Sequence, residues 1–176
     1  ARIIGFNHDY AGDGSLTHIA FETVETLDGD IPMNEKSTNE GGWDASYLRA
    51  KLNGNFFEKQ LPADLKAVIK PVVKMTAKSS KNEVRVPSVD KLFVLSEQEV
   101  FGRKIYSCGY EGKWYDWYKR ENTPYGKCKQ NGERDWRWER SPYSGNTNTF
   151  CHVDTNGNAD NNGASNSIGV SFGFCI

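Results

Sequence analysis

The last nine residues constrain the fold of this chain more than any other segment. Large apolar residues occupy every second position and small residues stand between them: Ile168, Val170, Phe172, Phe174 and Ile176 against Gly169, Ser171, Gly173 and Cys175. A period of two predicts a β-strand with all the large side chains on one face. Small side chains on the other face indicate that a second element packs closely against that backbone. We therefore predict a buried strand at the C-terminus.

The segment before this strand is polar and almost uncharged. From Ser141 to Ile176 the chain has no Lys, Arg or Glu, and its only formal charges are Asp154 and Asp160, whereas seven asparagines fall there. A disordered polar tail can have such a composition. Because the closing strand fixes the far end of this segment, we interpret it instead as loops held on a scaffold.

The composition of the whole chain narrows the class of protein. Its 176 residues suit one domain, and its net charge of −1 gives no general attraction to nucleic acid. It has no apolar run of the roughly 20 residues that would insert into a membrane. The chain starts at Ala1 without an initiator Met or a signal-peptide pattern. We therefore expect residues 1–176 to be a single domain from the C-terminal part of a longer protein.

Local patterns predict an α+β fold with short elements. We expect strands at 2–6, 19–27 and 91–95, helices from an N-cap at Asp44 to Asn53-Gly54 and from Pro62 to Pro71, and a surface loop at 76–90. Ser96 and Glu99 have the spacing of a capping box, and Gly102 should end that helix. Glu97 has no part in the capping box, so we expect its side chain to point into solvent.

The four cysteines do not form a recognisable metal or redox motif. Cys108, Cys128, Cys151 and Cys175 are separated by 20, 23 and 24 positions, and none belongs to a C-x-x-C pair. Two disulfides are one reading of this set. Because Cys175 falls on the small face of the closing strand, we favour reduced, buried thiols.

The sequence likewise contains no complete metal-binding or catalytic motif. Oxygen-bearing side chains alternate from Asp154 to Asp160, but Ala159 and Ser165 replace the Gly and Glu that a calcium-binding EF-hand loop needs. His152-x-Asp154 resembles the start of an iron-binding triad, yet no histidine follows it. No nucleophile lies in a recognisable motif with a base. We therefore predict a protein that is not an enzyme and that needs no metal or cofactor.

Aromatic residues are dense between residues 106 and 138. The cluster Tyr110, Trp114, Tyr115, Trp117 and Tyr118 could stack on sugar rings or fill the core, and we favour the core. Arg140 follows this region and is flanked by aromatic residues. We expect a structural role for it, in hydrogen bonds to carbonyls or in an ion pair with Glu139 or an earlier acid.

Four motifs in order carry a resemblance to a known family. They are Trp43-x-x-Ser46-x-Leu48-Arg49-x-x-Leu52-Asn53, Asp90-Lys91-Leu92-Phe93-Val94-Leu95-Ser96-Glu97, Trp138-x-Arg140-Ser141-Pro142 and Gly169-Val170-x-Phe172. Together they resemble an uncharacterised family of bacterial and prophage proteins, related to the formylglycine-generating-enzyme branch of the C-type lectin fold. The resemblance implies a C-type lectin-like single domain with short helices around small antiparallel sheets. The paired-cysteine centre of those enzymes and the calcium motifs of sugar-binding lectins have no counterpart here.

Some members of that family resemble variable proteins of diversity-generating retroelements. In such proteins adenine-directed mutagenesis alters codons of a C-terminal region, and the fold displays the altered side chains on one solvent-facing surface. The resemblance implies that residues 143–168 are this ligand-binding surface. The implied residues are Tyr143, Asn146, Asn148, His152, Asp154, Asn156, Asn158, Asp160, Asn161, Asn162, Asn166 and Ile168.

The sequence therefore predicts a non-enzymatic ligand-binding or receptor-binding domain. Short polar side chains suit such a surface because they adapt their hydrogen bonds, as in antibody loops. The expected partner is a protein or glycan on a host or neighbouring cell surface, and the expected location is a virion or the cell exterior. Two alternatives remain: a degenerate formylglycine-generating-type enzyme, and a structural module of a virion or surface protein.

Overall fold

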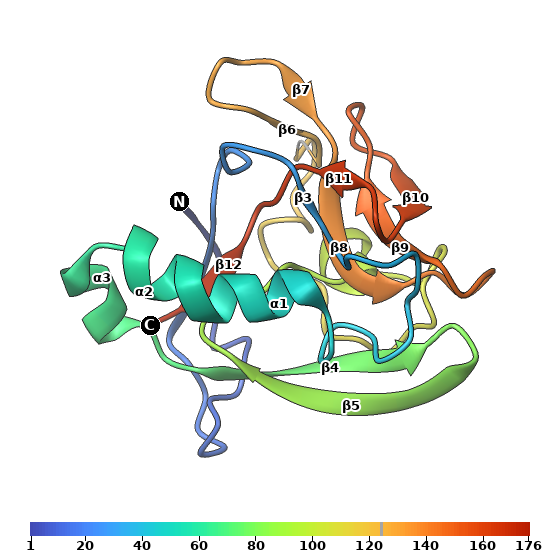
Figure 1. The fold of residues 1–176 in the computed structure, drawn as a ribbon. Coiled ribbons are helices and arrows are strands. Elements are labelled where there is room, and N and C mark those ends of the chain that lie inside the picture. The colour runs from blue at the N-terminus through green and yellow to red at the C-terminus, as the bar shows by residue number, and fades with distance from the viewer. Residues whose placement is uncertain (124) are drawn as a thin grey trace.

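A computed structural model describes residues 1–123 and 125–176, which form a mixed α+β fold (Figure 1). Two antiparallel sheets have three strands each. The first contains β1 (Arg2–Phe6), β2 (Ile19–Glu22) and β12 (Gly173–Cys175), in the order β1-β2-β12. The second contains β8 (Arg137–Pro142), β9 (Thr149–Val153) and β10 (Ala159–Gly163), in the order β10-β9-β8. Few and short helices surround these sheets, as the sequence predicts.

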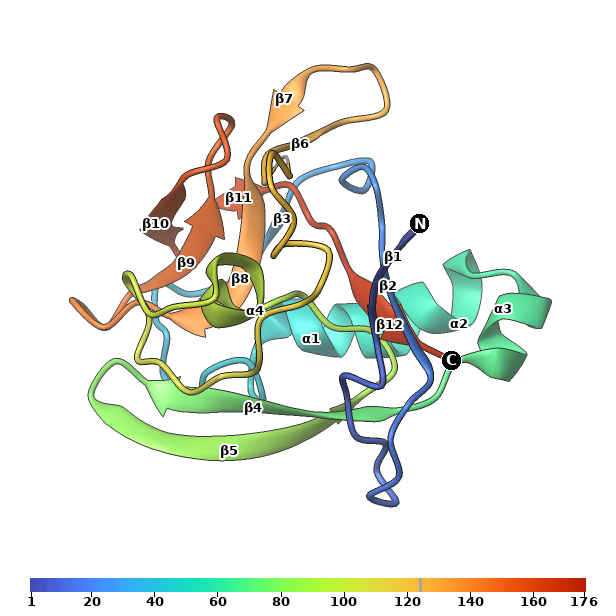
Figure 2. The same cartoon turned by 180° about the vertical axis from the view of Figure 1, so that it is seen from behind.

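Three two-stranded pairs complete the strands in the described residues. They are β3 (Ile31–Pro32) with β11 (Ser167–Ile168), β4 (Val72–Ser79) with β5 (Asn82–Asp90), and β6 (Lys127–Cys128) with β7 (Arg134–Asp135). The β4–β5 hairpin runs along one side of the molecule, as Figures 1 and 2 both show. None of the helices formed by the described residues has the length and apolar character that crossing a membrane requires.

The predicted C-terminal strand is buried, although it is divided into β11 and β12. Residues 168–175 are all buried. A Cβ atom added at Gly173 would lie 2.6 Å from the Phe93 ring, and one added at Gly169 would lie 2.1 Å from a carboxylate oxygen of Asp135. Small residues are therefore required on this face because neighbouring chain packs directly on the backbone, which confirms the predicted close packing.

The first helical region differs from the prediction at its N-terminal end. Ser46, not Asp44, is the N-cap of α1 (Tyr47–Lys51), and its hydroxyl accepts a hydrogen bond from the Arg49 N–H. The next segment, η1 (Leu52–Phe56), joins two helices across a kink at Gly54, whose backbone is not helical, and leads into α2 (Phe57–Gln60). Asn53 directly precedes this kink, which lies where the sequence predicts the end of the first helix. It binds the backbone of Lys91 and Leu92 and so fastens the helix to that segment.

Later elements follow the prediction more closely, with one exception. Pro62 precedes α3 (Ala63–Val68), and α4 (Glu97–Phe101) has the predicted capping box and a left-handed Gly102 at its end. Residues 91–95 were expected to be a strand. They form instead a buried connection that makes a single bridge, from Phe93 to Gly173.

The predicted surface loop at 76–90 is wrong, because these residues belong to the β4–β5 hairpin. Its inward positions carry polar side chains that are nonetheless buried: Lys74, Thr76, Ser79, Ser88 and Asp90. Their partners come from distant parts of the chain, as when the Trp43 indole N–H donates to Asp90 at 2.8 Å. A pattern of hydrophobic residues therefore does not reveal this hairpin.

Candidate functional site

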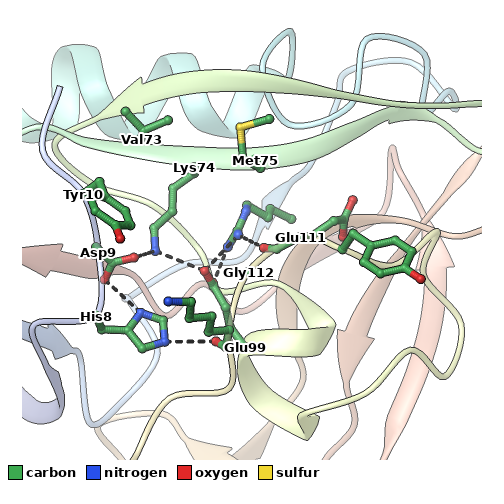
Figure 3. Close-up of a pocket in the computed structure, with 12 residues that line it drawn as sticks. His8, Asp9, Tyr10, Val73, Lys74, Met75, Glu99, Glu111 and Gly112 are labelled. Carbon is green, nitrogen blue, oxygen red and sulfur yellow. Dashed lines mark hydrogen bonds and ion pairs between the residues drawn. The ribbon is translucent and has the colours of Figure 1, made fainter. Parts of the chain in front are cut away.

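A hollow of about 390 Å³ lies between the β1–β2 loop, β4, α4 and residues 110–113 (Figure 3). Its floor is a network of buried charges. The Lys74 ammonium donates to a carboxylate oxygen of Asp9 at 2.5 Å, to Glu99 Oε1 at 3.1 Å and to the Tyr115 hydroxyl at 2.8 Å. The Arg140 guanidinium binds both oxygens of Glu99, with Nη2 to Oε1 at 2.9 Å. The network thus joins five separate segments of the chain.

The charges of this network balance, and their pKa values move away from neutrality. Burial opposes ionisation of Asp9, but Lys74 and His8 outweigh it and hold the pKa of Asp9 well below its usual range. Burial likewise opposes the charge on Glu99 and on Lys74, yet their ion pairs lower the pKa of Glu99 and raise that of Lys74. A general acid or base needs a pKa near the working pH. This arrangement therefore favours a structural role, and it confirms the prediction for Arg140.

A second buried cluster joins β2 to β6 and β8. The Lys127 ammonium lies 3.1 Å from Glu22 Oε2, and the Tyr118 hydroxyl donates to the same carboxylate at 2.7 Å. Burial lowers the pKa of Lys127 to about 8, although Glu22 opposes the shift. Arg137 also faces Glu22, at 3.6 Å. Here too the acid is surrounded by cationic and hydroxyl partners.

A third cluster contains the residues that could hold a metal ion. Glu97, Glu139 and Cys151 are all buried, and their ligand atoms lie within 4.8 Å of one another. The expectation that Glu97 points into solvent is wrong. Its carboxylate accepts hydrogen bonds from the N–H groups of Ile105, Tyr106 and Ser107.

The predicted surface at 143–168 is partly exposed and partly buried. Five of its predicted residues are exposed and five are half-buried: Asn148, Asn156, Asn158, Asp160 and Asn166, then Tyr143, Asn146, Asp154, Asn161 and Asn162. His152 and Ile168 are buried, so their predicted exposure is wrong. Both residues alternate onto the core side of their strands, where His152 contacts Trp138 and Ile168 joins the hydrophobic core.

Several of the half-buried residues hold turns. The Asp154 carboxylate accepts hydrogen bonds at 2.8 Å from the N–H groups of Asn156 and Asn158. Asn146 Oδ1 accepts from the Asn148 N–H and, at 2.7 Å, from the Thr149 hydroxyl. Such bonds shape a loop without any ion. Asp154 and Asn146 are therefore turn-forming residues.

A groove beside this surface contains a residue that the sequence did not single out. Trp136 is 43% exposed and lines a hollow of about 320 Å³. The other lining residues are Asp30, Arg134, Asp135, Thr155, Ser167 and Ile168. An exposed Trp after the charged Arg134-Asp135 pair is the signal that could have identified it. We call this hollow the Trp136 groove.

The buried His152 ring contacts Trp136 of the Trp136 groove. Its ring centroid is 5.3 Å from that of Trp136, and Asp160 is its partner in the β9–β10 register. Neither ring nitrogen has a hydrogen-bond partner among the described residues. Burial lowers the pKa of His152, although Asp160 and Asp154 oppose the shift. The imidazole is therefore a neutral ring that supports Trp136 in the groove.

The aromatic cluster at 110–118 divides between core and surface. Tyr115 and Tyr118 are buried and belong to the core, as predicted, whereas Trp114 and Trp117 are half-buried against it. Tyr110 is 84% exposed and lines the hollow of about 390 Å³ whose floor is the Asp9–Lys74–Glu99–Arg140 network; we call it the charged hollow. Cys128, Cys151 and Cys175 are reduced thiols, and Cys108, Cys151 and Cys175 are buried.

The molecule is thus a small α+β domain with ionic clusters inside and a polar, tryptophan-containing groove outside. Residues 17–176 match the family described as a domain of unknown function (DUF6273), and the chain belongs to that family. No curated protein matches the chain, and no solved structure matches it.

Proposed function

We propose that this protein is a non-enzymatic binding domain whose recognition surface is the Trp136 groove together with the exposed polar residues at 148–166. Its target is a protein or glycan on a host or neighbouring cell, and its location is a virion or the cell exterior. We also propose that the domain has a C-type lectin-like fold and is related to the variable proteins of diversity-generating retroelements. The four sequence motifs support this part of the proposal.

The observation that carries the proposal is the setting of Trp136. Its ring is accessible in a groove bordered by carboxylates (Asp30 and Asp135), hydroxyls (Thr155 and Ser167) and a guanidinium. A tryptophan with polar groups around it combines a large apolar contact with directional hydrogen bonds, as protein and sugar recognition both require. The exposed residues Asn156 and Asp160 lie in sequence between Thr155 and Ser167, which both line the groove.

The electrostatics of the Asp9–Lys74–Glu99–Arg140 network support a role without catalysis for these four residues. Asp9, Glu99 and Lys74 form ion pairs with one another or with Arg140, and their pKa values move away from neutrality. Glu111, which also lines the hollow, differs from them, because burial raises its pKa to about 6. Binding through the outer surface needs none of these groups to change its protonation.

The test compares two exposed aromatic residues. Trp136→Ala should reduce binding to intact cells, or to the recognised member of a glycan and protein panel, by about 30-fold, because a central Trp typically contributes about 2 kcal/mol. Tyr110→Ala is the matched control: it removes an exposed ring that does not line the Trp136 groove and should leave binding unchanged. Equal binding by the parent and Trp136→Ala, with the fold intact by circular dichroism, would show that the groove is not the site.

A separate test addresses diversification of the surface. The gene should lie near a reverse transcriptase gene and a near-repeat of the region encoding residues 143–168, with differences concentrated at adenines. A second substitution set, Asn156, Asn158, Asp160 and Asn166 all changed to Ser, should alter target preference with little change in stability, because exposed substitutions shift stability by within about 0.5 kcal/mol each. Unfolding of this variant would contradict a display surface.

A further inference from the structure

The cluster of Glu97, Glu139 and Cys151 brings together three elements in the interior. Glu97 is the first residue of α4, Glu139 lies in β8, and Cys151 lies in β9, the strand next to β8. All three side chains are inaccessible to solvent. One carboxylate oxygen from each glutamate and the cysteine sulfur lie within 4.8 Å of one another.

Glu139 is the side chain that this environment does not satisfy. Both of its carboxylate oxygens are buried, and neither has a hydrogen-bond partner among the described residues. A carboxyl group buried in this way costs several kcal/mol unless a proton or a cation compensates it. Arg137 and Arg140 precede and follow this part of β8, but they form ion pairs with Glu22 and Glu99. The cluster therefore has an excess of acidic ligand groups over cationic partners.

Glu97 is already oriented for a shared ligand. The N–H groups of residues 105–107 bind its two oxygens at 2.8–2.9 Å and fix the plane of the carboxylate. Outer hydrogen bonds of this kind orient the ligands of metal sites. Two more buried oxygens without a partner among the described residues belong to the same region of the chain, Ser107 Oγ and Glu111 Oε2. The site is thus built from a fixed carboxylate, an unpaired carboxylate and a thiol.

We propose that Glu97, Glu139 and Cys151 bind one zinc ion that fastens α4 to the β8–β9 strands. The thiol selects against calcium and magnesium, which take oxygen ligands, whereas zinc accepts both sulfur and carboxylate oxygen. Zinc–ligand bonds of about 2.0–2.3 Å put tetrahedral ligand atoms about 3.3–3.6 Å apart. With Glu97 held in place, rotation about the side-chain bonds of Glu139 and Cys151 can close the remaining separation. This site is independent of the Trp136 groove and of the proposed binding function.

The sequence motifs gave no indication of this site because its ligands are 42 and 12 positions apart (139 minus 97, and 151 minus 139). Structural zinc motifs usually place at least two ligands a few positions apart. Here the antiparallel pairing of β8 with β9 and the position of α4 bring the ligands together. The expectation of a metal-free protein rested on motifs alone, and this inference replaces it.

The experiment loads the metal during refolding, because the site is closed to solvent. The 176-residue chain is unfolded with a chelator, refolded with or without Zn²⁺, passed through a desalting column and analysed for metal. We expect about one zinc per chain and a higher melting temperature in the zinc-loaded sample. Glu139→Gln and Cys151→Ser should each weaken zinc binding at least about 100-fold, since even outer-shell changes cost 10–100-fold. Cys128→Ser, which removes a thiol outside the cluster, should retain the metal.

Loading with Co²⁺ keeps the test decisive if a buried variant does not fold. A thiolate-to-cobalt charge-transfer band in the parent protein, also present in Cys128→Ser, supports Cys151 as a ligand. The proposal is overturned if the parent retains no zinc and melts at the same temperature with and without it. It is also overturned if the cobalt band is missing, or if Glu139→Gln and Cys151→Ser retain zinc as the parent does.

Discussion

Two buried polar clusters share the same two elements but differ in charge balance. Helix α4 directs Glu99 into the Asp9–Lys74–Arg140 network and Glu97 into the Glu97–Glu139–Cys151 cluster. Strand β8 likewise supplies Arg140 to the network and Glu139 to the cluster. The network pairs two acids with two bases, whereas the cluster collects two acids and a thiol.

The difference shows that burial alone does not decide the state of an ionisable group. Burial acts against the charge of both Glu99 and Glu139. At Glu99 the neighbouring Arg140 and Lys74 overcome it and lower the pKa. At Glu139 the neighbouring Glu97 adds to burial, and the pKa is raised well above its usual value. The network is therefore complete as it stands, and the cluster needs a proton or a cation.

The largest expected effect follows from breaking the network. Arg140→Met removes both bonds to Glu99 and the donors to the carbonyls of Val94 and Glu111. Removing one partner of a buried ion pair typically costs about 3–5 kcal/mol, because the other charge remains buried. We expect a loss of this size in the free energy of unfolding by urea. Arg103→Met, at an exposed position, is the control, and an equal loss there would refute this account of the network.

The parts of the fold that the sequence predicted depend on neighbouring residues. The capping box of α4 needs Ser96 and Glu99 only, and the closing strand is evident from nine consecutive residues. The β4–β5 hairpin was missed because its buried Lys74 finds partners 65 and 25 positions away, at Asp9 and Glu99. Polar residues of this kind are interpreted as surface unless their distant partners are known.

The same reasoning applies to the candidate sites. The Asn-rich composition identified the segment around the Trp136 groove but not which side chains point outward. Burial of His152 depends on Trp138, on the neighbouring strand, and turn formation by Asp154 depends on the backbone of Asn156 and Asn158. Composition records none of these pairings, so exposed, supporting and turn-forming residues were predicted as one set.

A pH titration tests the same contrast between the two clusters, and the expected change in the free energy of unfolding is of intermediate size. Burial raises the pKa of Glu111 from 4.5 to about 6, and its raised value puts it with Glu139 and not with Glu99. A carboxyl group with a raised folded-state pKa stabilises the fold below its unfolded pKa, and that contribution is lost as the pH rises through the folded pKa. The difference amounts to about 2 kcal/mol for this shift.

The corresponding experiment compares the parent with Glu111→Gln, whose amide oxygen can still accept the Ala77 N–H bond. Between about pH 4.5 and pH 7, the unfolding free energy of the parent should fall by about 2 kcal/mol relative to that of the variant. Urea titrations of the chelator-treated proteins at both values measure this. Parallel pH profiles would mean that Glu111 is not held neutral by burial.

The smallest effect is expected at Glu139, and it gives the sharpest contrast with Arg140. Glu139→Met introduces the same side chain as Arg140→Met, one position earlier in the same buried strand. It removes an acid that has no hydrogen-bond partner among the described residues. Replacing unsatisfied buried polar groups by apolar side chains of similar volume is often neutral or stabilising. In chelator-treated protein we therefore expect the free energy of unfolding to stay within about 1 kcal/mol of the parent, or to rise. A loss as large as that of Arg140→Met would show that Glu139 has a stabilising partner without metal. With zinc at 100 times its dissociation constant, the free energy of unfolding should rise by about 2.7 kcal/mol in the parent and not in Glu139→Met. The parent should therefore become clearly more stable than the variant only when zinc is added.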